Sequence, residues 1–211
     1  MCDKMQVQKK GMLKPQISDL GNTVNAGTVL RANTKAHSAI CTKRHAQNIR
    51  ELTREEWADI LPVLKDSINK IDKAYNPAGY KLSIPTGPIA AQNSSHFYMR
   101  IVPKYKENYG SLGIKGISWK AFSSEGTEEV KNLFQVTEDN NVIVAERSNI
   151  VAKLHSELGN ITISTKNHLP NDINAVDQET WNQIGEVCQE LIRKMESSGF
   201  VTDSVIRCEL K

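Results

Sequence analysis

The stretch SSHFYMRIVPKY, residues 94–105, alternates polar and apolar side chains. A β-strand points every second residue to the same side of its sheet. The alternation therefore predicts a strand with one polar face and one apolar face, the apolar face packing on a core. The two sets are His96, Tyr98 and Arg100 on the polar face, and Phe97, Met99 and Ile101 on the apolar face.

Small polar residues come directly before this strand. Gln92, Asn93, Ser94 and Ser95 offer hydrogen-bonding groups that suit phosphate oxygens. Arg100 adds a planar, forked cation that also suits phosphate. The spacing leaves two interpretations open: a phosphate-binding site, or an ordinary amphipathic strand whose polar face meets solvent.

Farther out, the chain contains two similar segments. Each has a β-rich run that ends in Lys-x-His, at residues 43–45 and 166–168, followed by a loop and a helix with an early Trp. Thr53 and Glu56 have the spacing of a capping box, and Asp177 is a suitable N-cap for the second helix. The repeated order predicts that one structural unit occurs twice.

Hydrophobic periodicity predicts the fold class. Strand candidates are HSAICT at 37–42, NVIVAE at 141–146 and NITIST at 160–165, and residues 106–130 suggest a long connection with one strand. We predict an α+β fold in which one helix lies on one mostly antiparallel sheet, twice over. The helical stripes that would face the sheet are Trp57, Ile60, Leu61, Leu64, Ile68, Ile71 and Tyr75, and Trp181, Ile184, Cys188, Leu191 and Met195.

Charge and cysteine content argue against several classes of function. The net charge of +3 and the pI near 8.6, without a dense Lys/Arg stripe, argue against a nucleic-acid partner. No apolar run has the length of a signal peptide core or a membrane span. Four scattered cysteines indicate a reduced, cytoplasmic environment, and the absence of a cysteine–histidine cluster argues against a metal site. We expect no cofactor.

Two passages in residues 20–120 resemble the histidine-triad (HIT) superfamily of nucleotide hydrolases and transferases. KAHSAICTKRH, residues 35–45, is similar to the family's Gly-His, apolar run and Pro-Lys-Arg-His, with Ala36 for glycine and Thr42 for proline. HFYMRIVPK, residues 96–104, is similar to the signature His-φ-His-φ-His-φ-φ, where φ is apolar, followed by proline and a basic residue. Gln92 falls where the family often has a phosphate-contacting glutamine.

The resemblance implies a nucleotide site with an altered triad. The first triad histidine is kept as His96, but Tyr98 stands at the nucleophile's position and Arg100 at the third. Imidazole ionises near pH 6.5 and phenol near pH 10, so a tyrosine is a poor nucleophile at neutral pH. The residues predicted to bind the ligand are His37, Gln92, Asn93, Ser94, His96, Tyr98 and Arg100.

Three functions follow from this altered triad. The first is a HIT-like protein that binds a nucleotide or another phosphate ligand without triad catalysis. The second is an active nucleotidyl hydrolase or transferase that uses a modified triad. The third, of a different class, is a protein-interaction scaffold with no small ligand.

The second half of the chain resembles the front of the same fold, without a triad segment. Histidine-triad proteins commonly work as two-fold dimers whose sheets join. We therefore predict a HIT-like domain at residues 1–125 and a truncated repeat at residues 126–211, which together form an intramolecular pseudo-dimer.

Overall fold

The computed structural model describes residues 21–29, 34–87, 92, 94–106, 118–123, 134, 142–155, 160–167, 169, 172–197 and 204–210. Asn93 of the predicted site and residue 168 of the second Lys-x-His lie outside these ranges. The strands are β1 (Val24–Thr28), β2 (Ser38–Thr42), β3 (Gly79–Thr86), β4 (Tyr98–Lys104), β5 (Ser118–Ser123), β6 (Val142–Glu146), β7 (Ile150–His155), β8 (Asn160–Thr165) and β9 (Ser204–Leu210). The helices are α1 (Arg54–Tyr75) and α3 (Gln178–Ser197), with 3-10 turns η1 (Ile49–Glu51) and η2 (Ile173–Ala175).

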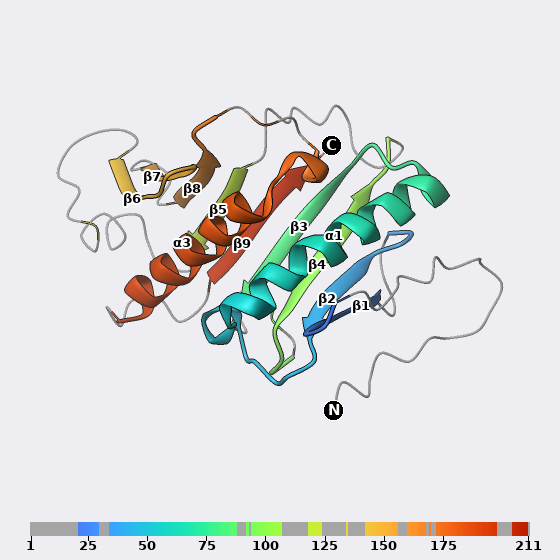
Figure 1. Ribbon diagram of the computed structural model, residues 1–211, viewed down its shortest axis with the longest axis horizontal. Helices are drawn as coiled ribbons and strands as arrows, with labels where there is room; N and C mark the ends of the chain where they lie inside the picture. Colours follow the sequence, from blue (N-terminus) through green and yellow to red (C-terminus); the bar gives the residue numbers. More distant parts are fainter. Residues whose placement is uncertain are drawn as a thin grey trace.

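All of these strands belong to one antiparallel sheet. Its order is β1-β2-β4-β3-β9-β5-β8-β7-β6, with β3 and β9 paired near the middle. Figure 1 shows α1 and α3 side by side across the same face of the sheet, and their residues are in contact. The predicted α+β class with a helix-covered antiparallel sheet is confirmed.

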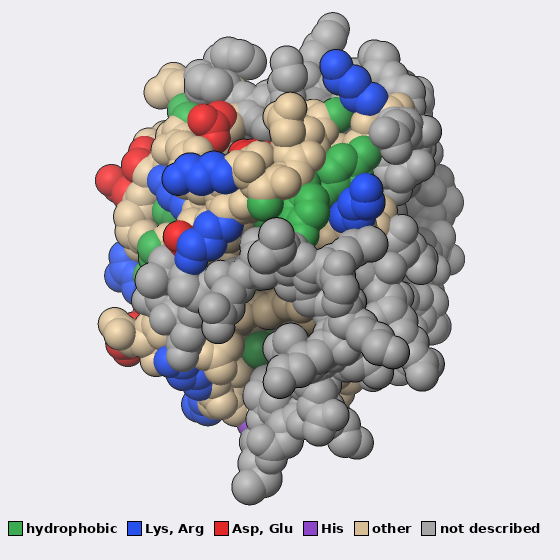
Figure 2. Space-filling model, turned by 90° about the vertical axis from the view of Figure 1, so that its right-hand side faces the viewer, with side chains coloured by type: hydrophobic (Ala, Val, Ile, Leu, Met, Phe, Trp, Pro, Cys, Tyr) green, Lys and Arg blue, Asp and Glu red, His purple; other side chains and the backbone are tan. Residues whose placement is uncertain are grey.

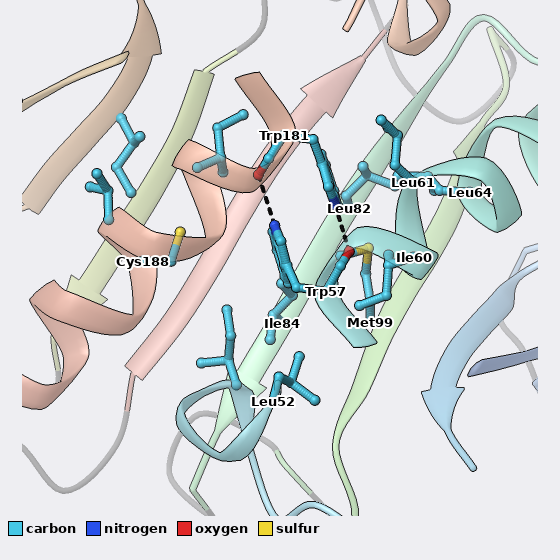
Figure 3. Close-up of a cluster of buried hydrophobic side chains, with 14 of the residues drawn as sticks. Leu52, Trp57, Ile60, Leu61, Leu64, Leu82, Ile84, Met99, Trp181 and Cys188 are labelled. Carbon is cyan, nitrogen blue, oxygen red and sulfur yellow. Dashed lines mark hydrogen bonds between the residues drawn. The ribbon is translucent and has the colours of Figure 1, made fainter. Parts of the chain in front are cut away.

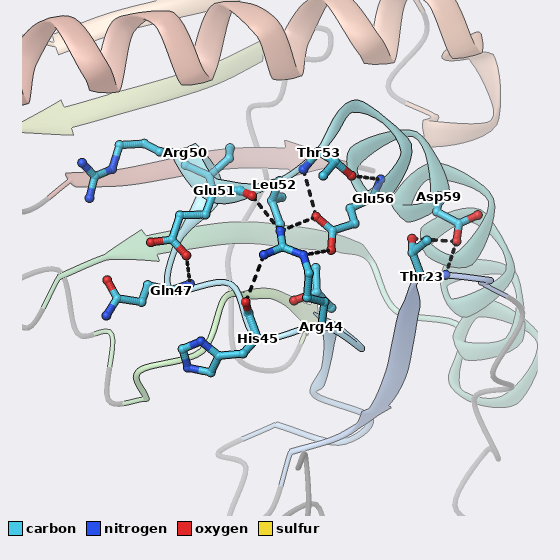
Figure 4. Close-up of polar contacts among 12 residues, drawn as sticks. Thr23, Arg44, His45, Gln47, Arg50, Glu51, Leu52, Thr53, Glu56 and Asp59 are labelled. Atoms are coloured by element: carbon cyan, nitrogen blue, oxygen red, sulfur yellow. Dashed lines mark hydrogen bonds and ion pairs between the residues drawn. The ribbon is translucent and has the colours of Figure 1, made fainter.

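The start of α1 is fixed by polar contacts that the sequence predicts (Figure 4). The amide of Glu56 donates to Oγ1 of Thr53 at 3.1 Å, and the amide of Thr53 donates to Oε2 of Glu56 at 2.9 Å. This confirms the capping box, which satisfies two amides that the helix leaves without partners. Arg44 then binds both carboxylate oxygens of Glu56, at 2.9 and 2.8 Å, and so links the end of β2 to the start of α1.

The start of α3 uses the predicted N-cap. The Asp177 side chain accepts a hydrogen bond from the amide of Thr180 at 2.7 Å. A carboxylate also suits the positive end of the helix dipole. In the described part of the chain, neither α1 nor α3 has an apolar stretch that would cross a membrane.

The core lies between the two helices and the sheet. The predicted stripes face it, and Figure 3 shows side chains of both helices meeting those of β3 and β4. At the contact between the helices, the rings of Trp57 and Trp181 stack with centroids 4.7 Å apart and planes inclined by 6°. The Trp57 indole N–H donates to the carbonyl of Trp181 at 2.7 Å, and the Trp181 indole N–H donates to the carbonyl of Trp57 at 2.8 Å.

Strand β5 has an unexpected place in the sheet. It precedes β6 in the chain, yet it pairs with β8 on one side and β9 on the other. Its hydrogen bonds therefore join it to the strands of the second half, although the predicted boundary at residue 125 assigns it to the first domain. The boundary itself stays a prediction.

Candidate functional site

The site is built on β4. The apolar set, Phe97, Met99 and Ile101, is buried on the side of the helices. Tyr98 and Arg100 alternate with these residues and are half-buried on the opposite face. The predicted alternation is confirmed, and it places the polar side chains on the face that α1 and α3 leave uncovered.

Tyr98 and Arg100 form a pair on this face. Nη2 of Arg100 donates to the hydroxyl oxygen of Tyr98 at 2.8 Å, and the guanidinium carbon lies 5.1 Å from the centroid of the phenol ring. A cation over an aromatic ring is attracted by its π-electrons. The tyrosine therefore fixes the direction of a guanidinium that has several further N–H donors.

His37 lies one strand away, directly before β2. Ala39 of β2 is opposite Arg100, so His37 belongs to the same face of the sheet. Its Nε2 atom is buried and has no hydrogen-bond partner among the residues that the structure describes. Burial first and the nearby charge of Arg100 second lower the pKa of His37 below its usual value. A neutral imidazole with an unsatisfied nitrogen remains beside the guanidinium.

His96 is bound to the neighbouring strand. Its Nε2–H donates to the carbonyl oxygen of Thr42 at 2.8 Å, and the Thr42 hydroxyl lies 3.2 Å from the same nitrogen. A carbonyl oxygen only accepts, so this contact fixes the proton on Nε2. The ring also meets His45 edge to face, with centroids 5.3 Å apart. This histidine therefore fastens the start of β4 to the end of β2.

Gln92 and Ser94 shape the turn that leads into β4. The Gln92 side chain accepts from the amide of Gly87 at 2.8 Å and donates to the carbonyl of Gln47 at 2.6 Å. Oγ of Ser94 accepts from the amide of His96 at 3.3 Å. Both side chains contact backbone groups here, so their predicted contacts with a phosphate stay predictions.

The first Lys-x-His is structural in this fold. Nζ of Lys43 donates to the carbonyl of Gly21 at 3.0 Å, and His45 packs against His96. No group of three His, Cys, Asp or Glu side chains in the described ranges is arranged to hold a metal ion. The sequence did not point to Ser83 of β3, which lies directly opposite Arg100, because that pairing joins residues far apart in the chain.

Comparison with known proteins identifies the family. Residues 14–107 match the HIT domain. Adenosine 5'-monophosphoramidase hnt1 of Schizosaccharomyces pombe is 36% identical over 100 residues, which are 47% of this chain and 68% of that protein. Bis(5'-adenosyl)-triphosphatase of Dictyostelium discoideum is 26% identical over 35% of this chain and 49% of its own length. The chain belongs to the HIT domain family.

Most of the chain also has a solved structure with a similar fold. An ADP-glucose phosphorylase from Arabidopsis thaliana, solved with bound ADP-glucose, superposes with a TM-score of 0.59 over 88% of this chain and 71% of that one. The two sequences are 13% identical, so this likeness concerns the fold alone. It extends well beyond the matched HIT domain, into the second half of the sheet.

Proposed function

We propose that this protein binds a nucleotide or a related phosphate ligand on the uncovered face of β4, without triad catalysis. The observation that carries the proposal is the Arg100 guanidinium, oriented by Tyr98 next to the partnerless Nε2 of His37. A guanidinium binds phosphate oxygens through paired N–H groups, and a neutral imidazole offers one further hydrogen bond. Gln92, Asn93, Ser94 and His96 are the remaining predicted contacts.

The names of the relatives support a phosphate-containing ligand. The fission yeast protein is named for an adenosine monophosphoramidate and the Dictyostelium protein for an adenosine-bearing triphosphate. The matched part of this chain contains the β4 site. An adenosine nucleotide is therefore the first ligand to test.

Two contacts support the absence of triad catalysis. Tyr98 stands where the family has its nucleophile, and its hydroxyl oxygen accepts a hydrogen bond from Arg100. His96 donates its Nε2–H to the backbone carbonyl of Thr42. This nitrogen therefore has no lone pair with which to accept a proton from a reacting group. A binding role uses these residues as they stand.

Thermal-shift measurements test binding. A ligand that binds only the folded protein raises its melting temperature. AMP, GMP, dinucleoside polyphosphates and sugar nucleotides should include at least one ligand that stabilises the chain, and Arg100→Ala should abolish that shift. Lys73→Ala, on the exposed end of α1, is the charge-matched control. A flat panel would reject binding and favour the protein-interaction scaffold.

An active nucleotidyl hydrolase or transferase is the second candidate, because the two relatives are named as enzymes. In that case Tyr98 would become covalently nucleotidylated during turnover. Mass spectrometry of the chain after incubation with dinucleoside polyphosphates would detect the added mass. Turnover that disappears in Tyr98→Phe would replace the binding proposal with this one.

We also propose that the sheet is an intramolecular pseudo-dimer of two HIT-like units. The reciprocal hydrogen bonds of Trp57 and Trp181 support it, since two-fold contacts exchange equivalent groups. Lys65 and Gln189, each eight residues after its tryptophan, likewise donate to the opposite unit's 3-10 turn region. Strand β5 would then take the place of β4 in the second unit. An experimental structure in which β7, β8, α3 and β9 fail to superpose on β1, β2, α1 and β3 would reject the pseudo-dimer.

A reduced, cytoplasmic location is part of the proposal. Cys41 and Cys188 are both buried, and neither forms a disulfide within the described part of the chain. Burial raises the pKa of the Cys188 thiol, so this cysteine is unreactive. Imaging of the tagged protein in its native cells would test the location.

A further inference from the structure

Ser83 of β3 carries a buried hydroxyl group for which the fold supplies no hydrogen bond. The residue is 8% exposed, and its side chain has no hydrogen-bond partner among the residues that the structure describes. A hydroxyl that is taken out of water without gaining a partner costs free energy. Such a group needs an explanation other than the stability of the fold.

The Ser83 side chain lies on the face of the sheet that carries the β4 site. Its neighbours along β3, Leu82 and Ile84, are fully buried on the helical side, so the side chain between them points to the opposite face. The register of β3 and β4 places Ser83 directly opposite Arg100. The Cβ atoms of such a pair are about 4.5–5.5 Å apart, which brings the hydroxyl close to the Arg100 side chain.

Two polar groups without partners therefore flank Arg100, one from each side. Nε2 of His37 lies on the side of β2, and the hydroxyl of Ser83 lies on β3. Both strands pair with β4, so they are about 10 Å apart, twice the spacing of neighbouring strands. An anion seated on the guanidinium between them has hydrogen-bonding groups within reach on either side.

The space that Arg100 needs does not by itself explain a serine at position 83. On the other side of Arg100, the directly opposite residue is Ala39, which is also buried. Its methyl group leaves similar room and has no polar atom to satisfy. The oxygen of Ser83 is therefore an addition to what the packing requires, and its position beside a guanidinium suits an anionic ligand.

We propose that Ser83 is a further ligand-binding residue of the β4 site, and that its hydroxyl donates a hydrogen bond to the same phosphate group that Arg100 binds. This inference rests on the proposed function, because Arg100 belongs to both. An ionised phosphate oxygen accepts such a bond, and a bond to a charged acceptor is stronger than one between neutral groups. The phosphate group then lies over the boundary between β3 and β4, where its oxygens reach both side chains.

The test needs controls for charge and for the loss of a hydroxyl. On the surface seen in Figure 2, Lys and Arg side chains are scattered among acidic and apolar ones, and exposed cations of this kind attract phosphate non-specifically. Lys73→Ala removes one exposed cation and measures that contribution. Ser164→Ala removes a half-buried hydroxyl from β8, where Ile163 beside it is buried on the helical side, so Ser164 shares the face of Ser83 in the other half of the sheet.

Titration calorimetry of the full chain, with AMP and separately with orthophosphate, tests the contact. We expect Ser83→Ala to weaken the binding of both ligands by about tenfold, as loss of one hydrogen bond to a charged group does. Ser83→Thr keeps the hydroxyl and should bind both more tightly than Ser83→Ala. Lys73→Ala and Ser164→Ala should leave the affinities unchanged.

The melting temperature without ligand separates a binding role from a structural one. Removing a buried hydroxyl that has no partner relieves its desolvation cost, so Ser83→Ala should melt at the temperature of the wild type or above it. The increase in melting temperature that AMP causes should be smaller in this variant than in the wild type. A lower melting temperature of ligand-free Ser83→Ala would show that the hydroxyl stabilises the fold, and would overturn the proposal.

Three binding results would also overturn the assignment of Ser83. They are an unchanged AMP affinity of Ser83→Ala, an equal loss in Ser164→Ala, and a loss for AMP without one for orthophosphate. If Arg100→Ala still abolishes the effect of AMP, such a result rejects the Ser83 contact and leaves the proposed function intact. If AMP does not bind while Arg100 and Ser83 control orthophosphate binding, the contact stands and the nucleotide assignment is rejected. If neither AMP nor orthophosphate binds the wild type, both are rejected.

Discussion

Gly185 of α3 lies directly against the indole ring of Trp57 on α1. A Cβ atom at position 185 would overlap Nε1 and Cδ1 of that ring. The ring is stacked on Trp181 and holds a hydrogen bond to the Trp181 carbonyl, so it has no free space in which to move aside. The absent side chain of Gly185 is therefore what lets the two helices approach at this point.

Replacing Gly185 with alanine should destabilise the protein. Alanine in a helix interior is favoured over glycine by about 1 kcal/mol. Forcing an extra group into a packed core costs typically about 1–3 kcal/mol, which outweighs that gain at this rigid contact. We expect a lower free energy of unfolding in urea denaturation. In a Trp57→Ala background the same change should become neutral or stabilising, and a more stable Gly185→Ala single variant would contradict the close contact.

The two tryptophan hydrogen bonds should contribute similarly to stability. Trp57→Phe and Trp181→Phe each remove one buried N–H donor and leave the opposite carbonyl without it, at a cost of about 1–3 kcal/mol. Chemical denaturation would measure both losses. Tyr105→Phe, which removes an exposed hydrogen bond to the carbonyl of Lys35, should change stability by less than about 0.5 kcal/mol. If the tryptophan variants lose as little stability as Tyr105→Phe, the reciprocal tryptophan hydrogen bonds do not stabilise the fold.

Ala36→Gly should make the protein more stable. Ala36 has a φ of 58°, in the left-handed region, where a Cβ atom costs about 1–2 kcal/mol. Glycine removes this strain, although it loses more entropy on folding, so the net gain should be about 0.5–1 kcal/mol. Ala39→Gly, inside β2, should have the opposite sign. A destabilised Ala36→Gly in thermal denaturation would show that the strain is absent.

The stability of the protein should fall in mildly acidic solution because of His37. Its pKa is lower in the folded protein than in the unfolded chain, where the usual value is about 6.5. The unfolded chain therefore binds more protons as the pH drops below about 6.5, and protonation favours unfolding. The free energy of unfolding of the wild type should decrease below that pH relative to His37→Gln, and the two should run parallel above it.

Arg100→Ala separates the two causes of this pH dependence. Burial is the larger cause and the Arg100 charge the smaller one. The substitution should therefore reduce the acid-induced loss of stability without removing it. Denaturation curves between pH 5 and pH 8, covering the region around the usual value of about 6.5, provide the measurement. A variant as acid-sensitive as the wild type would argue against electrostatic contact between the two residues.

Local rules predicted a large part of this fold. Three features depend on residues only a few positions apart: the capping box of α1, the Asp177 cap and the alternating faces of β4. Such features can be predicted without information about which segments pack together. The altered triad was identified from the resemblance to the HIT family, whose signature covers His96, Tyr98 and Arg100 within five residues. Gln92 and His96 come shortly before β4 in the sequence, but their backbone partners, Gln47 and Thr42, come from elsewhere in the chain.

The tertiary structure alone decided what lies next to these local features. Strand pairing joins Arg100 to Ser83, Ser83 to Arg207 and Arg207 to Lys120, and no periodicity in the sequence encodes that order. The insertion of β5 between β8 and β9 likewise depends on hydrogen bonds between distant segments. The sequence by itself determined which residues form the strand with a polar face and where the two helices begin. Helix capping and strand alternation act between residues only a few positions apart. Which charges share a face across the sheet was decided by long-range pairing, since register depends on the partner strand as much as on the strand itself.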